Sequence, residues 1–126
     1  MLDFLKRTPK LEATFHPTHA VARELAREVE IAGELVLRNR GRATELDALE
    51  VVLVAGGTRR IDLALPPGWA GRQRLETNSE LRAAVAWRLV LAAPMRAPAA
   101  EIQVNTTAGG KRRPLAMTAP FPLTSE

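Results

Sequence analysis

The sequence predicts an all-β protein, a single antiparallel β-sandwich of about seven strands. Three observations lead to this prediction. Apolar and polar residues alternate in successive short runs, which is the period of a strand packed on one face. Glycine, proline and asparagine separate these runs at intervals of about 10–15 residues, as turns do in a sandwich. No 3.6-residue periodicity continues through the middle of the chain.

The length and composition predict one globular domain over residues 1–126. The apolar fraction is 46% and the charged fraction is 25%, both ordinary for a globular protein. Residues 1–9 and 120–126 show no strong strand pattern and are expected to be loosely ordered ends. The chain has no cysteine, which excludes disulfides and thiolate chemistry.

The composition also predicts a location. No run approaches the roughly 20 apolar residues of a membrane span. The first ten residues contain an acid and lack the apolar stretch of a signal peptide, so the expected location is cytoplasmic. Arginine (15 residues) greatly exceeds lysine (3 residues), and alanine is abundant, which favours a GC-rich bacterial source.

Residues 10–15 are predicted as the first strand because every second residue is apolar. The next stretch leaves two alternatives open. Pro17 is incompatible with a regular interior, and Thr18 would cap one short helix near residues 19–28. The alternative is that residues 19–28 are strand.

Residues 28–41, EVEIAGELVLRNRG, are predicted as the second strand and its turn. From Val29 to Leu37 every second residue is apolar or glycine, and glutamates stand between them, so one face is packed and the other is solvated. Asn39 and Gly41 tolerate a positive φ and predict a turn between antiparallel strands.

Residues 43–55 are predicted as the next strand, with Leu46 out of phase with the rest. A bulge or bend near Asp47–Ala48 accounts for this phase difference. The glycines at 56–57 form a turn, and alternation resumes over residues 58–65.

Residues 80–92 alternate through Val85, Trp87 and Leu89 and are predicted as a strand, although their alanines also permit a helix. Residues 101–107 and 111–119 are predicted as a terminal hairpin, whose Pro114 fits only an edge or a strand start. The inward-facing positions of all these strands form one expected core: Val29, Ile31, Leu35, Leu37, Leu49, Val51, Leu53, Ile61, Leu63, Trp87 and Leu89.

A family resemblance follows from the first half of the chain. The strand KLEATF is followed, after an interval, by a pattern of valine, glycine, alternating strand, turn and strand. The pattern falls on Val29, Gly33, Leu35, Leu37, Gly41, Leu46, Leu49, Val51 and Leu53. Residues 10–55 thereby resemble the N-terminal part of the arrestin-like sporulation-control proteins. HAVARELAR stands in place of their Pro-Gly turn, and the chain has the length of one arrestin-like half.

The segments LRNRG (37–41) and LPPG (65–68) also resemble bacterial immunoglobulin-like accessory domains. Both resemblances imply a non-catalytic sandwich that works by binding, and neither supplies catalytic residues. The expected function is a protein-interaction or scaffolding module that self-associates or binds another protein. The alternative is a small ligand-binding protein or enzyme with a pocket at the mouth of the sandwich.

The candidate chemical groups do not combine into a catalytic or metal site. His16 and His19 with Glu12 offer metal-ligand chemistry, but Pro17 prevents a helical arrangement and a fourth ligand is missing. Neither serine lies in a nucleophile elbow, and the glycine turns lack the spacing of a phosphate loop. The pair Glu45 and Asp47 is expected to be solvated. We therefore expect no enzyme activity, no cofactor and no metal.

Two basic turns are the most distinctive polar feature. GGTRR (56–60) and GGKRR (109–113) each place two basic residues after glycines, and both would bind anions or an acidic partner if they met at one end of the sandwich. The candidate residues are Arg38, Arg40, Arg42, Arg59, Arg60, Lys111, Arg112 and Arg113. The alternative is ordinary solvated charge. Aromatic residues are only 4%, so nucleic acid is not an expected partner.

Trp69 lies in the predicted loop 66–71 and leaves two alternatives open. An exposed tryptophan would anchor a partner, and a buried one would cap the open end of the core. Edge protection predicts where self-association occurs. Pro114 and its basic neighbours would protect the last strand if it lies at an edge, whereas residues 10–15 contain no proline. We therefore expect association by strand addition or face packing near residues 10–15, giving a dimer or a peptide-docking edge.

Overall fold

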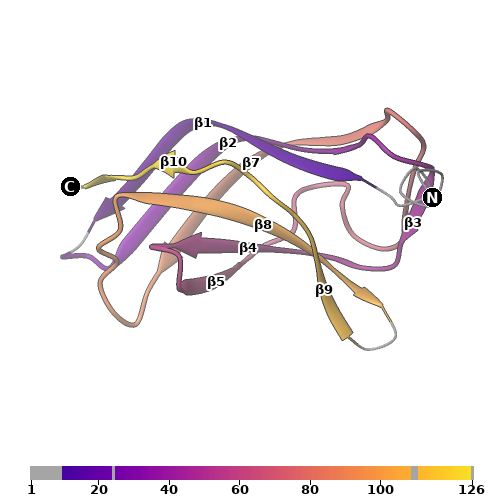
Figure 1. Cartoon of the computed structure of the whole chain (residues 1–126). Coiled ribbons are helices and arrows are strands. Elements are labelled where there is room, and N and C mark those ends of the chain that lie inside the picture. Colours follow the sequence, from indigo (N-terminus) through magenta and orange to yellow (C-terminus); the bar gives the residue numbers. More distant parts are fainter. Residues whose placement is uncertain (1–9, 24, 109–110, 126) are drawn as a thin grey trace.

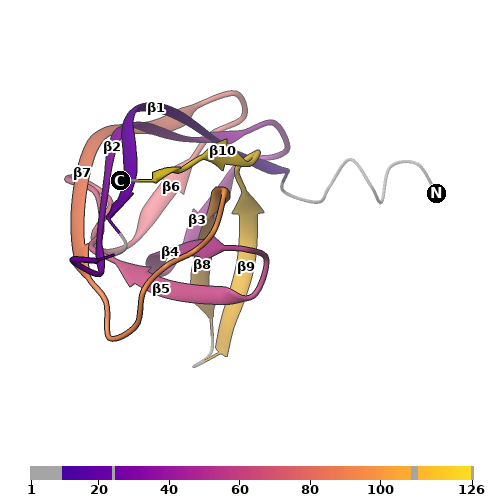
Figure 2. The same cartoon turned by 90° about the vertical axis from the view of Figure 1, so that its left-hand side faces the viewer.

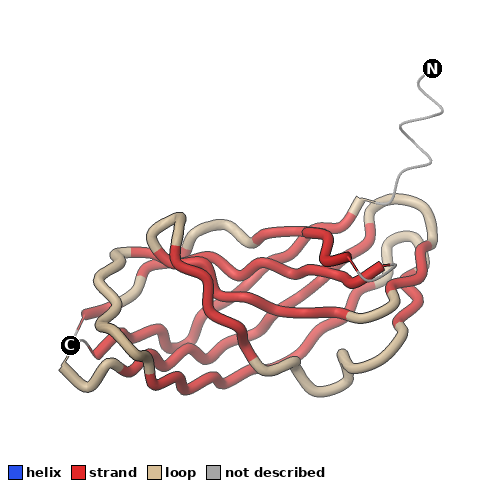
Figure 3. Tube along the Cα trace, turned by 90° about the horizontal axis from the view of Figure 1, so that it is seen from below, coloured by secondary structure: helices blue, strands red, loops and turns tan. Residues whose placement is uncertain are grey.

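The computed structural model describes residues 10–23, 25–108 and 111–125, and these residues form strands, turns and loops without a helix (Figure 3). The all-β prediction is therefore confirmed. The alternative helix near residues 19–28 is wrong, because the first strand continues to Arg23 and a turn at residues 25–27 leads directly into the second. Within the described ranges, no helix exists with the length and apolar character needed to cross a bilayer.

The described part of the chain contains eleven strands, more than the seven or so predicted. Several of the additional strands are short, with only two or three residues each, and such strands leave almost no alternating pattern in a sequence. The strands are β1 (Leu11–Arg23), β2 (Glu28–Asn39), β3 (Thr44–Leu46), β4 (Leu49–Ala55), β5 (Arg59–Leu63), β6 (Gln73–Leu75), β7 (Glu80–Val90), β8 (Ala99–Ala108), β9 (Lys111–Met117), β10 (Phe121–Pro122) and β11 (Thr124–Ser125).

Two large sheets lie face to face, with the core between them (Figures 1 and 2). One has the order β11-β1-β2-β7, which we call the β2 sheet. The other has the order β10-β8-β4-β5, with β9 also paired to β8, and we call it the β4 sheet. β3 and β6 form a separate two-stranded ribbon at one end. All described pairings are antiparallel except β1 with β11.

β2 is the strand that the alternating pattern predicted, and its inward side chains Ile31, Leu35 and Leu37 are at most 1% exposed. Gly33 is needed at its position because a β-carbon there would lie 2.3 Å from the carbonyl oxygen of His16. The close approach occurs beside the bulge at which the β1–β2 register shifts.

The turn after β2 differs from the prediction. Neither Asn39 nor Gly41 has a positive φ. The reason is that β2 does not lead into a hairpin: it pairs with β1 and β7, and the chain then leaves its sheet for β3 and β4. The predicted irregularity near Asp47–Ala48 is confirmed, since it separates β3 from β4.

β4 is buried on both faces, as expected of a nearly continuous apolar run in the middle of a sheet. Its inward side chains enter the core, whereas Val52 and Val54 lie on the outer face. The outer face also carries hydrogen bonds from Arg60 to Gln103 and, over 2.8 Å, from Gln103 Nε2 to Asn105 Oδ1. Arg60 is paired with Val54, and Gln103 is paired with Val52. The polar side chains on this face shield the two valines from water.

The predicted core is confirmed: nine of its eleven residues are buried, and Ile61 and Leu89 pack against it half-buried. The strand predicted over residues 58–65 is shorter and ends at Leu63, since two prolines follow Leu65. The glycine turn at 56–57 is confirmed, with φ of 61° and 79°.

Part of the C-terminal end that was predicted to be loosely ordered forms two short strands, β10 and β11, and Glu126 lies outside the described residues. β8 and β9 form the predicted hairpin, with Pro114 on the edge strand. Beyond it, β10 pairs with β8 and β11 pairs with β1, so the chain passes from the β4 sheet to the β2 sheet. Phe121 and Leu123 are buried between them, and this burial holds the segment in place. The other predicted loose end, residues 1–9, lies outside the described residues.

Candidate interaction site

The two basic turns do not meet. Ala55 pairs with Ala100, whereas Leu49 pairs with Thr106, so the connections β4–β5 and β8–β9 lie at opposite ends of the β4 sheet (Figure 1). The condition for a shared anion site, that both turns lie at one end of the sheet, is therefore not met. β4 and β8 are antiparallel neighbours, so the turns that follow them lie at opposite ends of the sheet. The sequence does not show that these two strands are neighbours.

Several of the eight candidate basic residues also have contacts within the chain. Arg59 donates to the carbonyl oxygens of residues 93 and 94 over 2.9 and 2.8 Å. Arg40 Nε lies 2.6 Å from Glu12 Oε2, and Arg112 Nε lies 2.6 Å from an oxygen of the Glu50 carboxylate. These groups support the local structure, and we do not treat the eight residues as one anion site.

Trp69 is 1% exposed and belongs to the core. Gly68 and Gly71 flank it in the loop, and their φ angles of 84° and 78° favour glycine. Of the two alternatives for this side chain, the cap on the open end of the core is the one that the structure has. Its ring is therefore not exposed for a partner.

His16 and His19 both lie on the outer face of β1, on the two sides of the bulge. His19 Nε2 is 3.1 Å from Glu30 Oε2. Across residues 10–23, 25–108 and 111–125, no three histidines and carboxylates lie close enough to hold a metal ion.

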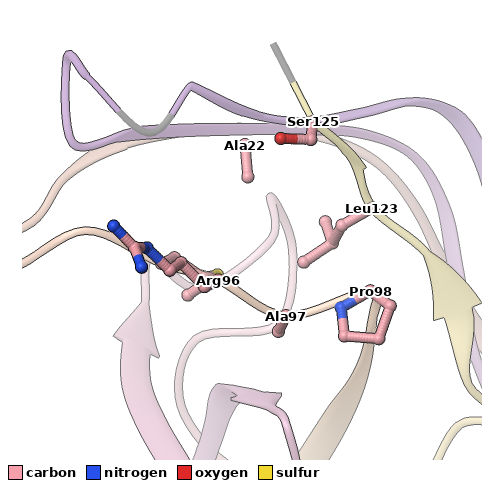
Figure 4. A pocket seen from close by; sticks show the side chains of 7 residues that line it. Ala22, Arg96, Ala97, Pro98, Leu123 and Ser125 are labelled. Atoms are coloured by element: carbon pink, nitrogen blue, oxygen red, sulfur yellow. The ribbon is translucent and has the colours of Figure 1, made fainter.

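A pocket of about 430 Å³ opens at the end of the two facing sheets where β11 meets β1 (Figure 4). We call it the end pocket. Its volume is in the range of small-molecule sites. The lining is made of short apolar side chains with one arginine and one serine: Ala22, Met95, Arg96, Ala97, Pro98, Leu123 and Ser125.

The outer face of the β2 sheet carries a network of ion pairs. Arg88 Nε is 2.5 Å from Glu28 Oε1, and Arg82 Nη2 is 2.8 Å from Glu80 Oε1. The hydrogen bond from Arg82 lowers the pKa of Glu80. A hydrogen bond from Arg23, and a second one from His19, likewise lower the pKa of Glu30.

This network predicts a loss of stability in acid. Because the pKa of Glu30 is lower in the folded than in the unfolded chain, the folded state binds fewer protons. The resulting stabilisation is present above the pH at which unfolded glutamate titrates and is lost as the pH falls through the folded pKa. We expect the urea midpoint to fall between about pH 6 and about pH 3, and to fall less steeply for Glu30→Gln. Parallel profiles for the two proteins would contradict this assignment.

The edges of the two sheets differ in how well they are protected against added strands. β9 contains Pro114 and three basic residues, and β5 is only five residues long and mostly charged. β1 is interrupted by its bulge, and β11 covers Val21 and Ala22. All three are therefore guarded or short.

Pro17 hinders the addition of a strand to the outer edge of β1. The bond from Arg40 N to Lys10 O, 2.7 Å, shows that Lys10 is bonded toward β2. Because hydrogen-bonding residues alternate along an antiparallel strand, the odd-numbered residues before the bulge direct their backbone groups away from β2. Pro17 is one of these residues and has no N–H to offer.

β7 is the exception among the edges. It pairs with β2 without interruption from Glu80, opposite Arg38, to Val90, opposite Glu28. It has 11 residues, contains no proline, glycine or lysine, and no described strand pairs with its other side (Figure 2). We call this side of the strand the β7 edge. β7 is an edge strand because of the order of the strands in its sheet. The sequence does not show that order, and the edge it predicts for association is at residues 10–15 instead.

The direction of the backbone groups on the β7 edge follows from two hydrogen bonds that flank the strand. Leu91 N donates to Arg27 O over 2.7 Å, and Asn39 N donates to Ser79 O over 3.0 Å. Both bonds involve odd-numbered residues on the β7 side. By alternation, the odd-numbered residues of β7 bond to β2, and the even-numbered residues from Glu80 to Val90 direct their N–H and C=O groups outward.

Comparisons with known proteins show the fold alone. No family model matches the chain, and no curated protein matches it. The crystal structure described as the "Putative ApaA Protein from Bordetella pertussis" has a TM-score of 0.54 and 12% identity, over 94% of this chain and 96% of that one. An X-ray structure of a Northeast Structural Genomics Consortium target has a TM-score of 0.51 and 11% identity, over 95% of this chain and 89% of that one. The chain is therefore similar in fold to both structures.

Proposed function

We propose that this protein is a non-catalytic protein-interaction module that binds an extended polypeptide segment as an additional strand on the β7 edge. The observation that carries the proposal is that β7 alone among the described edges is long, regular and unguarded. Strand addition uses main-chain hydrogen bonds for affinity and alternate side chains for specificity. The β7 edge offers both: outward backbone groups at even positions and the charged side chains of Glu80, Arg82 and Arg88 on the outer face.

The finer class of the fold and its setting belong to the same proposal. Two facing sheets with a mostly antiparallel order support an immunoglobulin-like or arrestin-like sandwich. The resemblance of residues 10–55 to the arrestin-like sporulation-control proteins also supports a binding role. The composition supports a bacterial, cytoplasmic setting. We place strand addition at β7 rather than at residues 10–15, because the bulge, Pro17 and β11 all interrupt the edge of β1.

Ala84→Pro tests the proposal. Proline removes an N–H that points outward, so the β2–β7 hydrogen bonds and the fold are retained while the added strand loses a donor. We expect proteins retained by the immobilised wild type from a bacterial lysate to bind the variant at least about tenfold more weakly. The matched control, Ala84→Val, keeps the N–H and should keep the binding.

Equal retention by all three proteins would contradict strand addition at β7. A small molecule that raises the melting temperature equally in wild type and Ala84→Pro would instead favour the second candidate, ligand binding in the end pocket, whose volume supports it.

A further inference from the structure

We infer that the segment bound at the β7 edge is β7 of a second copy of this chain, running antiparallel with Ala84 opposite Ala84. This inference rests on the proposed function and names its partner. A two-fold axis through the paired edges would join the β2 sheets of the two copies into one continuous sheet. The contact is isologous: both copies use the same residues, so every favourable or unfavourable residue pair away from the axis occurs twice.

The backbone restricts the register. Only the even-numbered residues of β7 direct hydrogen-bonding groups outward, so even positions of one copy must meet even positions of the other. With Ala84 at the two-fold axis, Arg82 lies opposite Ala86, and Glu80 lies opposite Arg88. These residues form the hydrogen-bonded pairs, while the odd-numbered residues stay bonded to β2.

Charge then selects among the registers that pair most of the strand. With Ala84 at the axis, Glu80 and Arg88 face each other twice, and opposite charges directly across a strand pair stabilise it. With Val85 at the axis, Arg82 would lie opposite Arg88 twice, which is repulsive. With Ala83 at the axis, Glu80 and Arg82 would face alanines and gain nothing. Only the first register uses the charges of the strand.

The side chains on the two faces also fit this register. On the outer face, Ala84 and Ala86 have no bulk that would keep a second strand away. On the inner face, Leu81 and Leu89 are only half-buried at this edge, and Trp87 keeps 7% exposure. In the pairing centred on Ala84, Leu81 of one copy lies opposite Trp87 of the other. The second strand therefore covers apolar surface that the single chain leaves partly open.

Charge reversal tests the register. Glu80→Arg alone places arginine opposite Arg88, and Arg88→Glu alone places glutamate opposite Glu80, so each variant repels a copy of itself. When the two variants are mixed in equal amounts, the arginine introduced at position 80 meets the glutamate introduced at position 88. The native Arg88 of the first variant then meets the native Glu80 of the second, so both contacts are attractive.

We expect the wild type to sediment as a dimer at high micromolar concentration and each variant to dimerise at least about tenfold more weakly. The equal mixture of the two variants should regain the dimerisation of the wild type. Recovery in the mixture separates a paired contact from a general loss of surface charge, because the mixture contains the same altered side chains as the single variants.

Arg72→Glu is the matched control. The side chain of Arg72 is 70% exposed, against 71% for Arg88, and it also has a carboxylate partner, Asp47, but it lies outside β7. This variant should dimerise as the wild type does. Circular dichroism should show an unchanged β-sheet spectrum for every variant, because all the altered side chains are on the surface.

Three outcomes would overturn the inference: a monomeric wild type at high micromolar concentration, single variants that dimerise normally, or a mixture that stays monomeric. The proposed function fails separately. If the wild type is monomeric but Ala84→Pro still loses a captured protein that Ala84→Val retains, strand addition at β7 stands and the second copy is the wrong partner. If Ala84→Pro changes neither capture nor assembly, strand addition at β7 is itself wrong.

Discussion

Asn39→Asp is expected to lower the free energy of unfolding by about 3–5 kcal/mol at neutral pH, the range found when a buried charge is left without a partner. The side chain of Asn39 is 0% exposed. Its Nδ2 donates to Arg42 O over 2.8 Å and to Leu75 O over 3.0 Å, and its Oδ1 accepts from Gly41 N over 2.9 Å. Aspartate has the same shape but would direct a carboxylate oxygen at two carbonyl oxygens.

The backbone of Asn39 shows why the position matters for the fold. Its N–H donates to Ser79 O, and its C=O accepts from Asn78 N over 2.7 Å. Backbone and side chain together join the end of β2, the loop after it and the loop before β7. Losing the two side-chain donors therefore loosens three segments at once.

Urea denaturation measures this effect, and Asn78→Asp is the matched control. Asn78 is exposed, and its φ of 65° is one that aspartate also tolerates, so we expect its free energy of unfolding to change by less than about 0.5 kcal/mol. The deficit of Asn39→Asp should deepen with rising pH. Burial raises the pKa of the introduced carboxyl, so the folded state tolerates it best when it is protonated. A deficit as small as that of Asn78→Asp would contradict the assignment.

Leu53→Ala is expected to lower the free energy of unfolding by about 2–5 kcal/mol. Leu53 is 0% exposed and lies at the middle of β4, paired with Ile61 on one side and Ile102 on the other. Removal of its side chain loses apolar burial and leaves a cavity, because strands on both sides hold the surrounding backbone in place.

Leu25→Ala is the matched control for Leu53→Ala. Leu25 lies in the turn between β1 and β2 and is 100% exposed, so the same chemical change removes no buried contact. Its urea midpoint should match that of the wild type. If the two variants had equal midpoints, the core between the sheets would be wrongly placed.

Local pattern was sufficient to predict several of the longer strands of this protein. The alternation in β2 and β7 predicted which side chains are buried, because a strand packed on one face must alternate whatever its neighbours are. The glycine turn at 56–57 and the edge position of Pro114 were likewise readable, since φ preferences and the missing N–H are properties of single residues.

Local pattern failed where a residue's role depends on distant partners. The sequence predicts Asn39 as a turn residue, but its side chain bonds the end of β6, 36 positions away along the chain. Residues 121–125 are too few to show alternation, and they form β10 and β11 only because β8 and β1 lie beside them to pair with. The sequence places Trp69 in a loop and leaves its exposure open. Its side chain is buried because it caps the open end of the core.

The sequence by itself determined that this chain forms strands, where most of them lie and which of their faces are apolar, because those properties depend on residues one or two positions apart. Only the tertiary structure decided that the basic turns lie apart and that β7, rather than residues 10–15, is the unguarded edge. An edge is defined by the strand that is missing beside it, and the order of strands is determined by packing between segments far apart in the chain.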